Sequence, residues 1–151
     1  MEVKAEVQHS AEKVWQRYVH EMDKVLPASM PGHFNEMLYV DGPPLAVGST
    51  FIVTYHEDIP HYNSIKFRWD EMNHEEHHFK CTLIDGGALN KHFSYLAYTF
   101  NILPGSTPES CVMQYIVEFV DLENHTFHAF IKEELEKFCN LLNSHLLTTS
   151  N

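Results

Sequence analysis

The sequence has few basic residues and no long apolar run, and each shortage excludes a class of protein. Ten lysines and arginines stand against 21 aspartates and glutamates, so the formal net charge is −11. The phosphates of nucleic acids and anionic membrane surfaces would repel such a chain. No apolar run approaches the ~20 residues of a transmembrane helix. We therefore expect no nucleic-acid partner and no membrane partner, and we attribute the charge to solvated acidic faces.

Cysteine is also scarce. The three cysteines, Cys81, Cys111 and Cys139, are odd in number and have no metal-like spacing. This pattern disfavours a disulfide framework and favours a reduced intracellular setting. The segment 1–7 alternates like a strand and lacks the apolar centre of a signal peptide. We expect a cytoplasmic protein without a cofactor or a bound metal.

Hydrophobic periodicity is the main feature that is present. It predicts a strand near residues 3–7, two short helices of which the second stops at Pro27, and a series of strands between 34 and 120. The pairs Asp70-Glu71 and Asn73-His74 predict a hairpin turn. The length of 151 residues suits one domain, 1–151, with a real core.

A long amphipathic helix is predicted from about His125 to Leu147. Its apolar face comprises Phe127, Phe130, Ile131, Leu135, Phe138, Leu141, Leu142 and Leu146. The helix must bury this stripe against the strands, because nothing else is available. We therefore predict an α+β domain with an antiparallel sheet, in which sheet and helix could enclose an apolar binding space.

Several motifs carry a resemblance to a known family. The strongest stretch runs from Asp70-Glu71-Met72-Asn73-His74 to Thr82-Leu83-Ile84-Asp85-Gly86-Gly87. These turns resemble, in sequence and separation, those of the plant pathogenesis-related class-ten family, the birch-pollen-allergen group. Within that family, four segments look most like the norcoclaurine-synthase-like branch: Val53-Thr54-Tyr55, Ile59-Pro60, Ser94-Tyr95-Leu96 and Val117-Glu118-Phe119.

The resemblance extends over the whole chain and implies a START-like helix-grip fold. In that fold a seven-stranded curved antiparallel sheet surrounds a long C-terminal helix, two short helices follow the first strand, and a large apolar cavity lies inside. One departure concerns the loop 41–48, which is usually glycine-rich in the family but here contains Pro43 and Pro44. Each proline removes a backbone N–H, so a phosphate cradle is not expected there.

Apolar and aromatic side chains of the strands and the last helix are the candidate ligand contacts. They are Val53, Tyr55, Phe67, Trp69, His77, Phe79, Cys81, Leu96, Tyr98, Phe100, Met113, Tyr115, Val117, Phe127, Ile131 and Phe138. The alternative is a solid aromatic core. Buried tyrosine hydroxyls need partners, which favours a partly polar cavity. The inward face of strand 93–103 stays open, because Tyr95 and Tyr98 lie on opposite faces.

Glu134 and His145 fall inside the apolar stripe of the last helix. A carboxylate that faces an apolar space can act as an acid or a base, so Glu134, Tyr115 and Tyr98 are the candidate catalytic residues. The alternative is that Glu134 pairs with a cation or reaches the cavity mouth, and that His145 sits at a frayed helix end.

An expected lysine is missing. Condensing members of the norcoclaurine-synthase-like branch use a lysine on the strand before the final helix. Here no lysine occurs between Lys91 and Lys132, and Gln114 occupies the expected region. Glutamine cannot transfer protons, so the Pictet–Spengler chemistry of that branch is not expected.

The segment His74-Glu75-Glu76-His77-His78 satisfies the zinc-protease pattern H-E-x-x-H, which requires a helix. It leads into a strand instead, where His74 and His78 would lie ~13 Å apart. We expect a solvated hairpin, with His77 directed inward beside Phe79.

Two functions fit these features. The first is an intracellular binding or carrier protein that encloses an amphipathic plant specialised metabolite or hormone. The second is an enzyme of alkaloid or phenolic metabolism that performs a condensation, cyclisation or isomerisation by acid–base chemistry without the strand lysine. In either case the expected partner is a small amphipathic molecule, and the expected state is a monomer or weak homodimer.

Overall fold

The computed structural model describes residues 1–59, 63–87, 89–122 and 126–148. The chain starts with β1 (Glu2–Val7), α1 (Ala11–Val14), the π-helix η1 (Trp15–Val19) and α2 (Met22–Ser29). Six strands follow: β2 (Phe34–Asp41), β3 (Thr50–Tyr55), β4 (Ser64–Asn73), β5 (His78–Gly86), β6 (Phe93–Pro104) and β7 (Cys111–Asp121). The long helix α3 (Thr126–Thr148) comes last.

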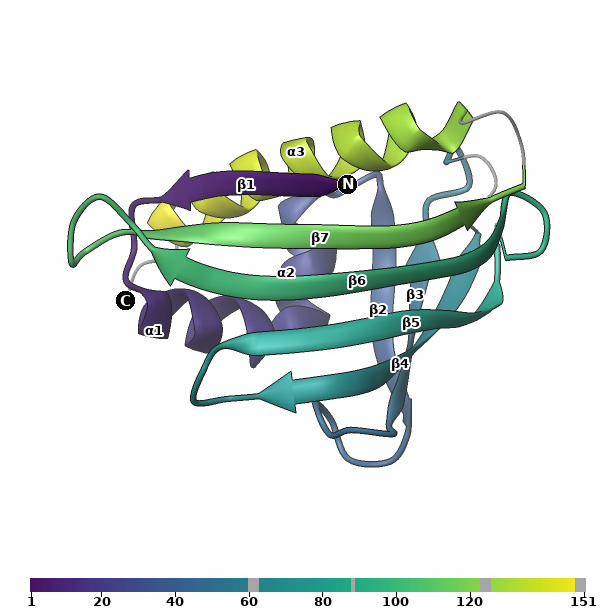
Figure 1. Cartoon of the computed structure of the whole chain (residues 1–151), viewed down its shortest axis with the longest axis horizontal. Coiled ribbons are helices and arrows are strands. Elements are labelled where there is room, and N and C mark those ends of the chain that lie inside the picture. The colour runs from purple at the N-terminus through teal and green to yellow at the C-terminus, as the bar shows by residue number, and fades with distance from the viewer. Residues whose placement is uncertain (60–62, 88, 123–125, 149–151) are drawn as a thin grey trace.

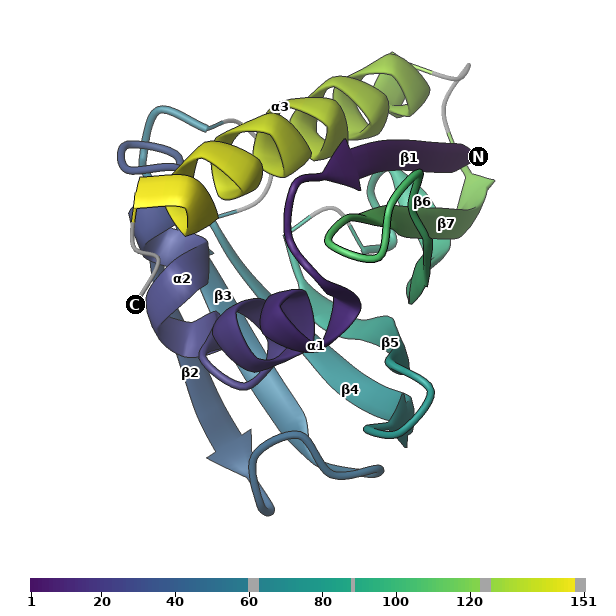
Figure 2. The same cartoon turned by 90° about the vertical axis from the view of Figure 1, so that its left-hand side faces the viewer.

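The strands form one antiparallel sheet in the order β1-β7-β6-β5-β4-β3-β2 (Figure 1). Strands β2 to β7 pair as successive hairpins, and β1 returns to pair with β7, with Val3 opposite Tyr115. Figure 2 shows the strong curvature of the sheet, with α3 across its open side and the short helices at one end. Register shifts in β2, β4 and β6 help to bend the strands. The predicted α+β helix-grip fold is confirmed.

Alternation and helical spacing decide which side chains enter the core. In β4 the side chains of Ile65, Phe67 and Trp69 are buried, whereas Arg68 is exposed. In α3 the buried face comprises Ile131, Glu134, Leu135, Phe138, Cys139, Leu142 and Leu146. Leu141, predicted to lie on this face, is 36% exposed because it lies at the edge of the stripe.

Two local predictions differ from the structure. Helix α2 continues through Pro27 to Ser29. Pro27 cannot donate to the carbonyl of Asp23, but the helix persists because it packs against β2. The predicted hairpin turn lies further along the chain than expected, because β4 runs through Asp70-Glu71 to Asn73 and the turn comprises residues 74–77. There the Asn73 side-chain oxygen accepts from the N–H groups of two turn residues.

None of the described helices is both long and apolar enough to cross a membrane.

Replacing Leu142 with alanine tests the packing of α3. Leu142 is fully buried, so we expect Leu142→Ala to lower the free energy of unfolding by about 2–5 kcal/mol, because a cavity is left behind. Leu141→Ala is the matched control on the same helix, with an expected loss of only about 0.5 kcal/mol. Urea unfolding measures both, and equal losses would contradict this orientation of α3.

Candidate ligand-binding site

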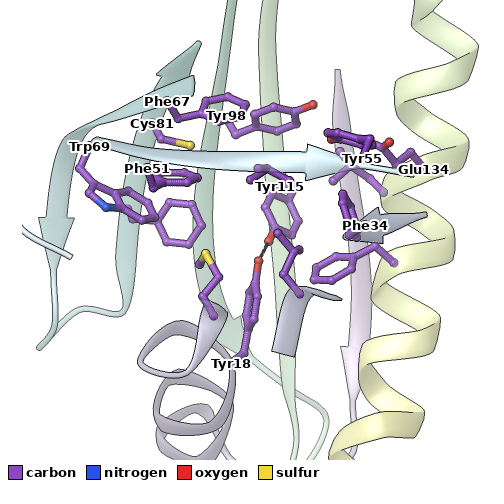
Figure 3. Close-up of a pocket in the computed structure, with 16 residues that line it drawn as sticks. Tyr18, Phe34, Phe51, Tyr55, Phe67, Trp69, Cys81, Tyr98, Tyr115 and Glu134 are labelled. Atoms are coloured by element: carbon purple, nitrogen blue, oxygen red, sulfur yellow. Dashed lines mark hydrogen bonds between the residues drawn. The ribbon is translucent and has the colours of Figure 1, made fainter. Parts of the chain in front are cut away.

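An apolar cavity of about 100 Å³ lies between the inner face of the sheet and the helices η1, α2 and α3 (Figure 3). Its wall is formed by Tyr18, Met22, Leu26, Phe34, Phe51, Val53, Tyr55, Phe67, Trp69, Phe79, Cys81, Tyr98, Tyr115, Glu134, Leu135 and Phe138. Ligand pockets usually measure about 300–1,000 Å³, so this space is small. The family resemblance implied a large cavity. The cavity is smaller because aromatic rings fill much of the interior; the ring centroids of Phe51 and Trp69, for example, are 4.5 Å apart.

Among the described wall residues, Glu134 is the one with an acidic side chain. Its Oε2 lies 2.7 Å from Nε2 of His33, and the two side chains are only 7% and 16% exposed. Oε1 of Glu134 has no hydrogen-bond donor in the part of the chain that the structure describes. In the view of Figure 3, Tyr55 and Glu134 lie together on the side away from Trp69, and the Tyr98 hydroxyl points toward that side. The cavity is therefore apolar with one polar side.

His33 follows α2 and is held by several contacts. Its backbone N–H donates to the Met30 carbonyl at 3.0 Å, and its own carbonyl accepts from the N–H of His56 at 2.8 Å. The imidazole lies against the rings of Phe34 and Tyr55, with centroids 4.7 and 5.5 Å away. The imidazole is thus fixed beside the Glu134 carboxylate.

A second polar contact lies deeper in the cavity wall. The hydroxyl groups of Tyr18 from η1 and Tyr115 from β7 are hydrogen-bonded to each other, and both side chains are buried (Figure 3). Burial raises the pKa of Tyr115 and of Tyr18 well above the usual tyrosine range. Both hydroxyls therefore stay protonated at neutral pH.

Sequence comparison now identifies the family. Residues 1–149 match the family model of the pathogenesis-related protein Bet v 1 family. The chain belongs to this family. A comparison with curated proteins gives no match.

Solved structures of the same fold include norcoclaurine synthase from Thalictrum flavum in complex with dopamine and hydroxybenzaldehyde. It superimposes with a TM-score of 0.77 at 20% sequence identity, over 100% of this chain and 87% of that chain. Ara h 8.0201 gives 0.81 at 15% identity, covering 99% and 97%. Major latex-like protein 151 from Panax ginseng gives 0.75 at 13% identity, covering 96% and 95%. At these identities the likeness is one of fold.

The Bet v 1 fold brings many predicted site residues together. Those that line the cavity are Val53, Tyr55, Phe67, Trp69, Phe79, Cys81, Tyr98, Tyr115, Glu134 and Phe138. On the strands, the period of two places these side chains on the inner face. Tyr98 also fixes the inward face of β6, which the sequence left open.

Other predicted residues are buried but do not line the cavity. They are Leu96, Phe100, Met113, Val117 and Ile131. The Phe100 ring shows why, because it is enclosed by other rings: those of Trp15, Tyr18, Phe79 and Tyr115 have centroids within 6.4 Å. The side chain of Phe127 lies outside the described residues.

The prediction for His77 is wrong. His77 belongs to the β4–β5 turn, with a positive φ of 54°, and β5 begins only at His78. Its Nε2 lies 3.1 Å from Oε2 of Glu12, and its ring lies against Trp15. The preceding His74 accepts the indole N–H of Trp15 at 3.2 Å. This H-E-x-x-H segment is thus not helical, and no three His, Cys, Asp or Glu residues of the described ranges are grouped to hold a metal.

Several wall residues were not among the predicted ligand contacts: Tyr18, Met22, Leu26, Phe34, Phe51 and Leu135. His33, which contacts the wall residue Glu134, was not predicted either. The spacing of four between Met22 and Leu26 on α2 was a usable signal, since residues so spaced share a helix face. His33 gave no signal, because it follows Pro31-Gly32 in an irregular segment. His145, predicted on the inner face, is half-buried near the end of α3 and does not line this cavity.

Gln114, in the region where the lysine was expected, does not face the cavity. Gln114 points away from the cavity, since its amide donates to Glu2 at 2.7 Å and its oxygen accepts from Asn101 at 3.0 Å. Tyr115 is the β7 residue that lines the cavity, and no lysine stands among the described wall residues. The thiol of Cys81, another wall residue, is unsuited to proton transfer near neutral pH, because burial raises its pKa.

A double-mutant cycle tests the tyrosine pair. Tyr18→Phe or Tyr115→Phe leaves the other hydroxyl buried without its partner, so each single change should lower the free energy of unfolding by about 1–3 kcal/mol. The double change removes both polar groups and should cost less than the sum of the singles. Urea unfolding of the four proteins gives the coupling energy, and strict additivity would argue against the hydrogen bond.

The same pair predicts a loss of stability in alkali. Above about pH 10 the unfolded chain releases tyrosine protons that the folded protein retains, because burial raises the pKa of both groups. The unfolded state then binds fewer protons, so the free energy of unfolding falls as pH rises, by up to about 1.4 kcal/mol per pH unit and group. The Tyr18→Phe/Tyr115→Phe protein should lose less between about pH 9 and 11. An unchanged slope would contradict the pKa direction.

Proposed function

We propose that this protein is a cytoplasmic binding or carrier protein that encloses a small amphipathic plant metabolite, with Glu134 as the polar anchor. The observation that carries this proposal is the carboxylate itself: Glu134 is 91% buried by area, lines an apolar cavity, and has one oxygen without a donor in the described chain. A carboxylate oxygen without a donor can accept a hydrogen bond from a ligand O–H or N–H, and a hydrogen bond to a charged group contributes about 1.5–3 kcal/mol. Apolar contact contributes a further ~25 cal/mol per Å² of ligand surface.

The size of the cavity supports a compact ligand. An engineered cavity of about 150 Å³ accommodates benzene, and the space here is about 100 Å³. One aromatic ring therefore suits it better than a fused multi-ring molecule. The norcoclaurine synthase structure holds dopamine and hydroxybenzaldehyde, which are single-ring phenols. That similarity of fold supports the choice of phenols as probes.

A second candidate is an enzyme of alkaloid or phenolic metabolism. The observation in its favour is the pair of His33 and Glu134, because a carboxylate hydrogen-bonded to an imidazole can accept and return a proton. Such chemistry would be an isomerisation, cyclisation or condensation that needs no lysine.

Glu134→Gln tests the anchor, with tyrosol, the neutral phenol 4-(2-hydroxyethyl)phenol, as the probe. An uncharged acceptor replaces a charged one, so we expect about fivefold weaker binding, equivalent to ~1 kcal/mol. Glu133→Gln, an exposed neighbour on α3, is the matched control and should bind like the native protein. Calorimetry gives the affinities.

Three outcomes separate the ideas. Equal affinity in Glu134→Gln would contradict the anchor, and failure of the native protein to bind any single-ring phenol would contradict the proposed function. Mass spectrometry of the recovered probes distinguishes a carrier from an enzyme, because a carrier returns each probe unchanged.

A further inference from the structure

The pair of His33 and Glu134 has two charge states that differ at the cavity wall. With a neutral imidazole, Nε2–H donates to the carboxylate and the pair carries one negative charge. With a protonated imidazole, the pair is an ion pair without net charge. Histidine side chains as a class change between these states from about pH 8 to pH 5.

The imidazole stays beside the carboxylate in both states. Contacts with Phe34 and Tyr55 confine the ring, and backbone hydrogen bonds to Met30 and His56 hold the main chain. Both states present a hydrogen-bond donor to Glu134, so protonation changes the charge of the pair and leaves its geometry in place. Because the two side chains are largely buried, this charge is weakly screened.

We propose that His33 is a specificity-determining residue that selects ligands by charge. Neutral His33 leaves Glu134 as an uncompensated anion that favours a cationic amine in the cavity. Protonated His33 compensates that anion and disfavours a second cation, while a neutral phenol or alcohol binds in both states. This inference rests on the proposed function, since it concerns molecules bound at Glu134.

The other ionisable side chains near the His33–Glu134 pair are partly or fully exposed, or are tyrosines. On β3 the neighbour is the Tyr55 side chain, and on β6 the Tyr98 hydroxyl points toward the same side of the cavity. After β3, His56 pairs with Asp58 at 3.3 Å, and these side chains are 36% and 81% exposed, so solvent screens them. On α3, Glu133 and Lys137 are exposed, and the wall residues of α2, Met22 and Leu26, are uncharged. Among the described residues, His33 is therefore the ionisable group in direct contact with the Glu134 carboxylate.

Two probes that differ in one group test the inference. Tyramine carries an ammonium group where tyrosol carries a hydroxyl, and an aliphatic amine stays protonated below about pH 8. We expect tyramine affinity to rise severalfold from about pH 5 to about pH 8, the range in which histidine side chains as a class lose their proton, whereas tyrosol affinity should change less than about twofold. Tyramine binding near the midpoint of this change should also release a proton, measured by calorimetry in buffers of different ionisation enthalpy.

Three variants test which residue causes the pH dependence of tyramine binding. His33→Gln keeps an N–H donor without a titrating group, so it should bind tyramine with the high-pH affinity at every pH. His56→Gln, which removes the neighbouring exposed imidazole, should keep the native pH profile. Glu134→Gln should lose most tyramine affinity at pH 7.5 while it retains tyrosol binding within about fivefold.

The contrary results are equally distinct. A tyramine affinity that does not change with pH, an unchanged pH profile in His33→Gln, or binding without proton release would each overturn the role of His33. In all three cases tyrosol binding would leave the proposed function intact. If neither probe binds at any pH, the proposed function itself fails.

Discussion

Burial of one face of α3 against a curved sheet is the interaction on which the rest of the structure depends. The sheet has one apolar inner face, and α3 runs across the open side of its curve. The helix stripe that meets this face includes Glu134 between Ile131 and Phe138, so the same packing that stabilises the fold carries a carboxylate into the interior. His33 compensates part of the cost of that burial, and the cavity forms where the two layers do not fully meet.

Much of this arrangement follows from periodicity, and the remainder depends on packing. Alternation in β4 and the helical spacing of α3 predicted the inward orientation of Phe67, Trp69 and Glu134. His33 could not be predicted in this way, because it lies in an irregular segment about one hundred residues from its partner. Periodicity also assigned Phe100 to the inner face but could not show that neighbouring rings enclose it. The face of a strand follows from adjacent residues, whereas the space around a ring depends on residues that are distant in the sequence.

Several polar side chains in the cavity wall are unsuited to proton transfer near neutral pH. The hydroxyls of Tyr18 and Tyr115 are hydrogen-bonded to each other. Burial raises the pKa of both hydroxyls and of the Cys81 thiol, so these groups keep their protons near neutral pH. No lysine reaches the wall among the described residues. Among the described residues at the cavity, the His33–Glu134 pair is therefore the polar contact that joins an imidazole to a carboxylate.

The return of β1 to β7 has a consequence for how the protein folds. The N-terminal amine donates to the carbonyl of Val117 across 116 residues of sequence, and Val3 lies opposite Tyr115. Contacts between such distant segments form late and slowly, because a long loop must close first. Tyr115 is part of the cavity wall, and its strand is held in the sheet beside the N-terminal strand. Pairing of β1 with β7 therefore supports the cavity wall as well as the sheet.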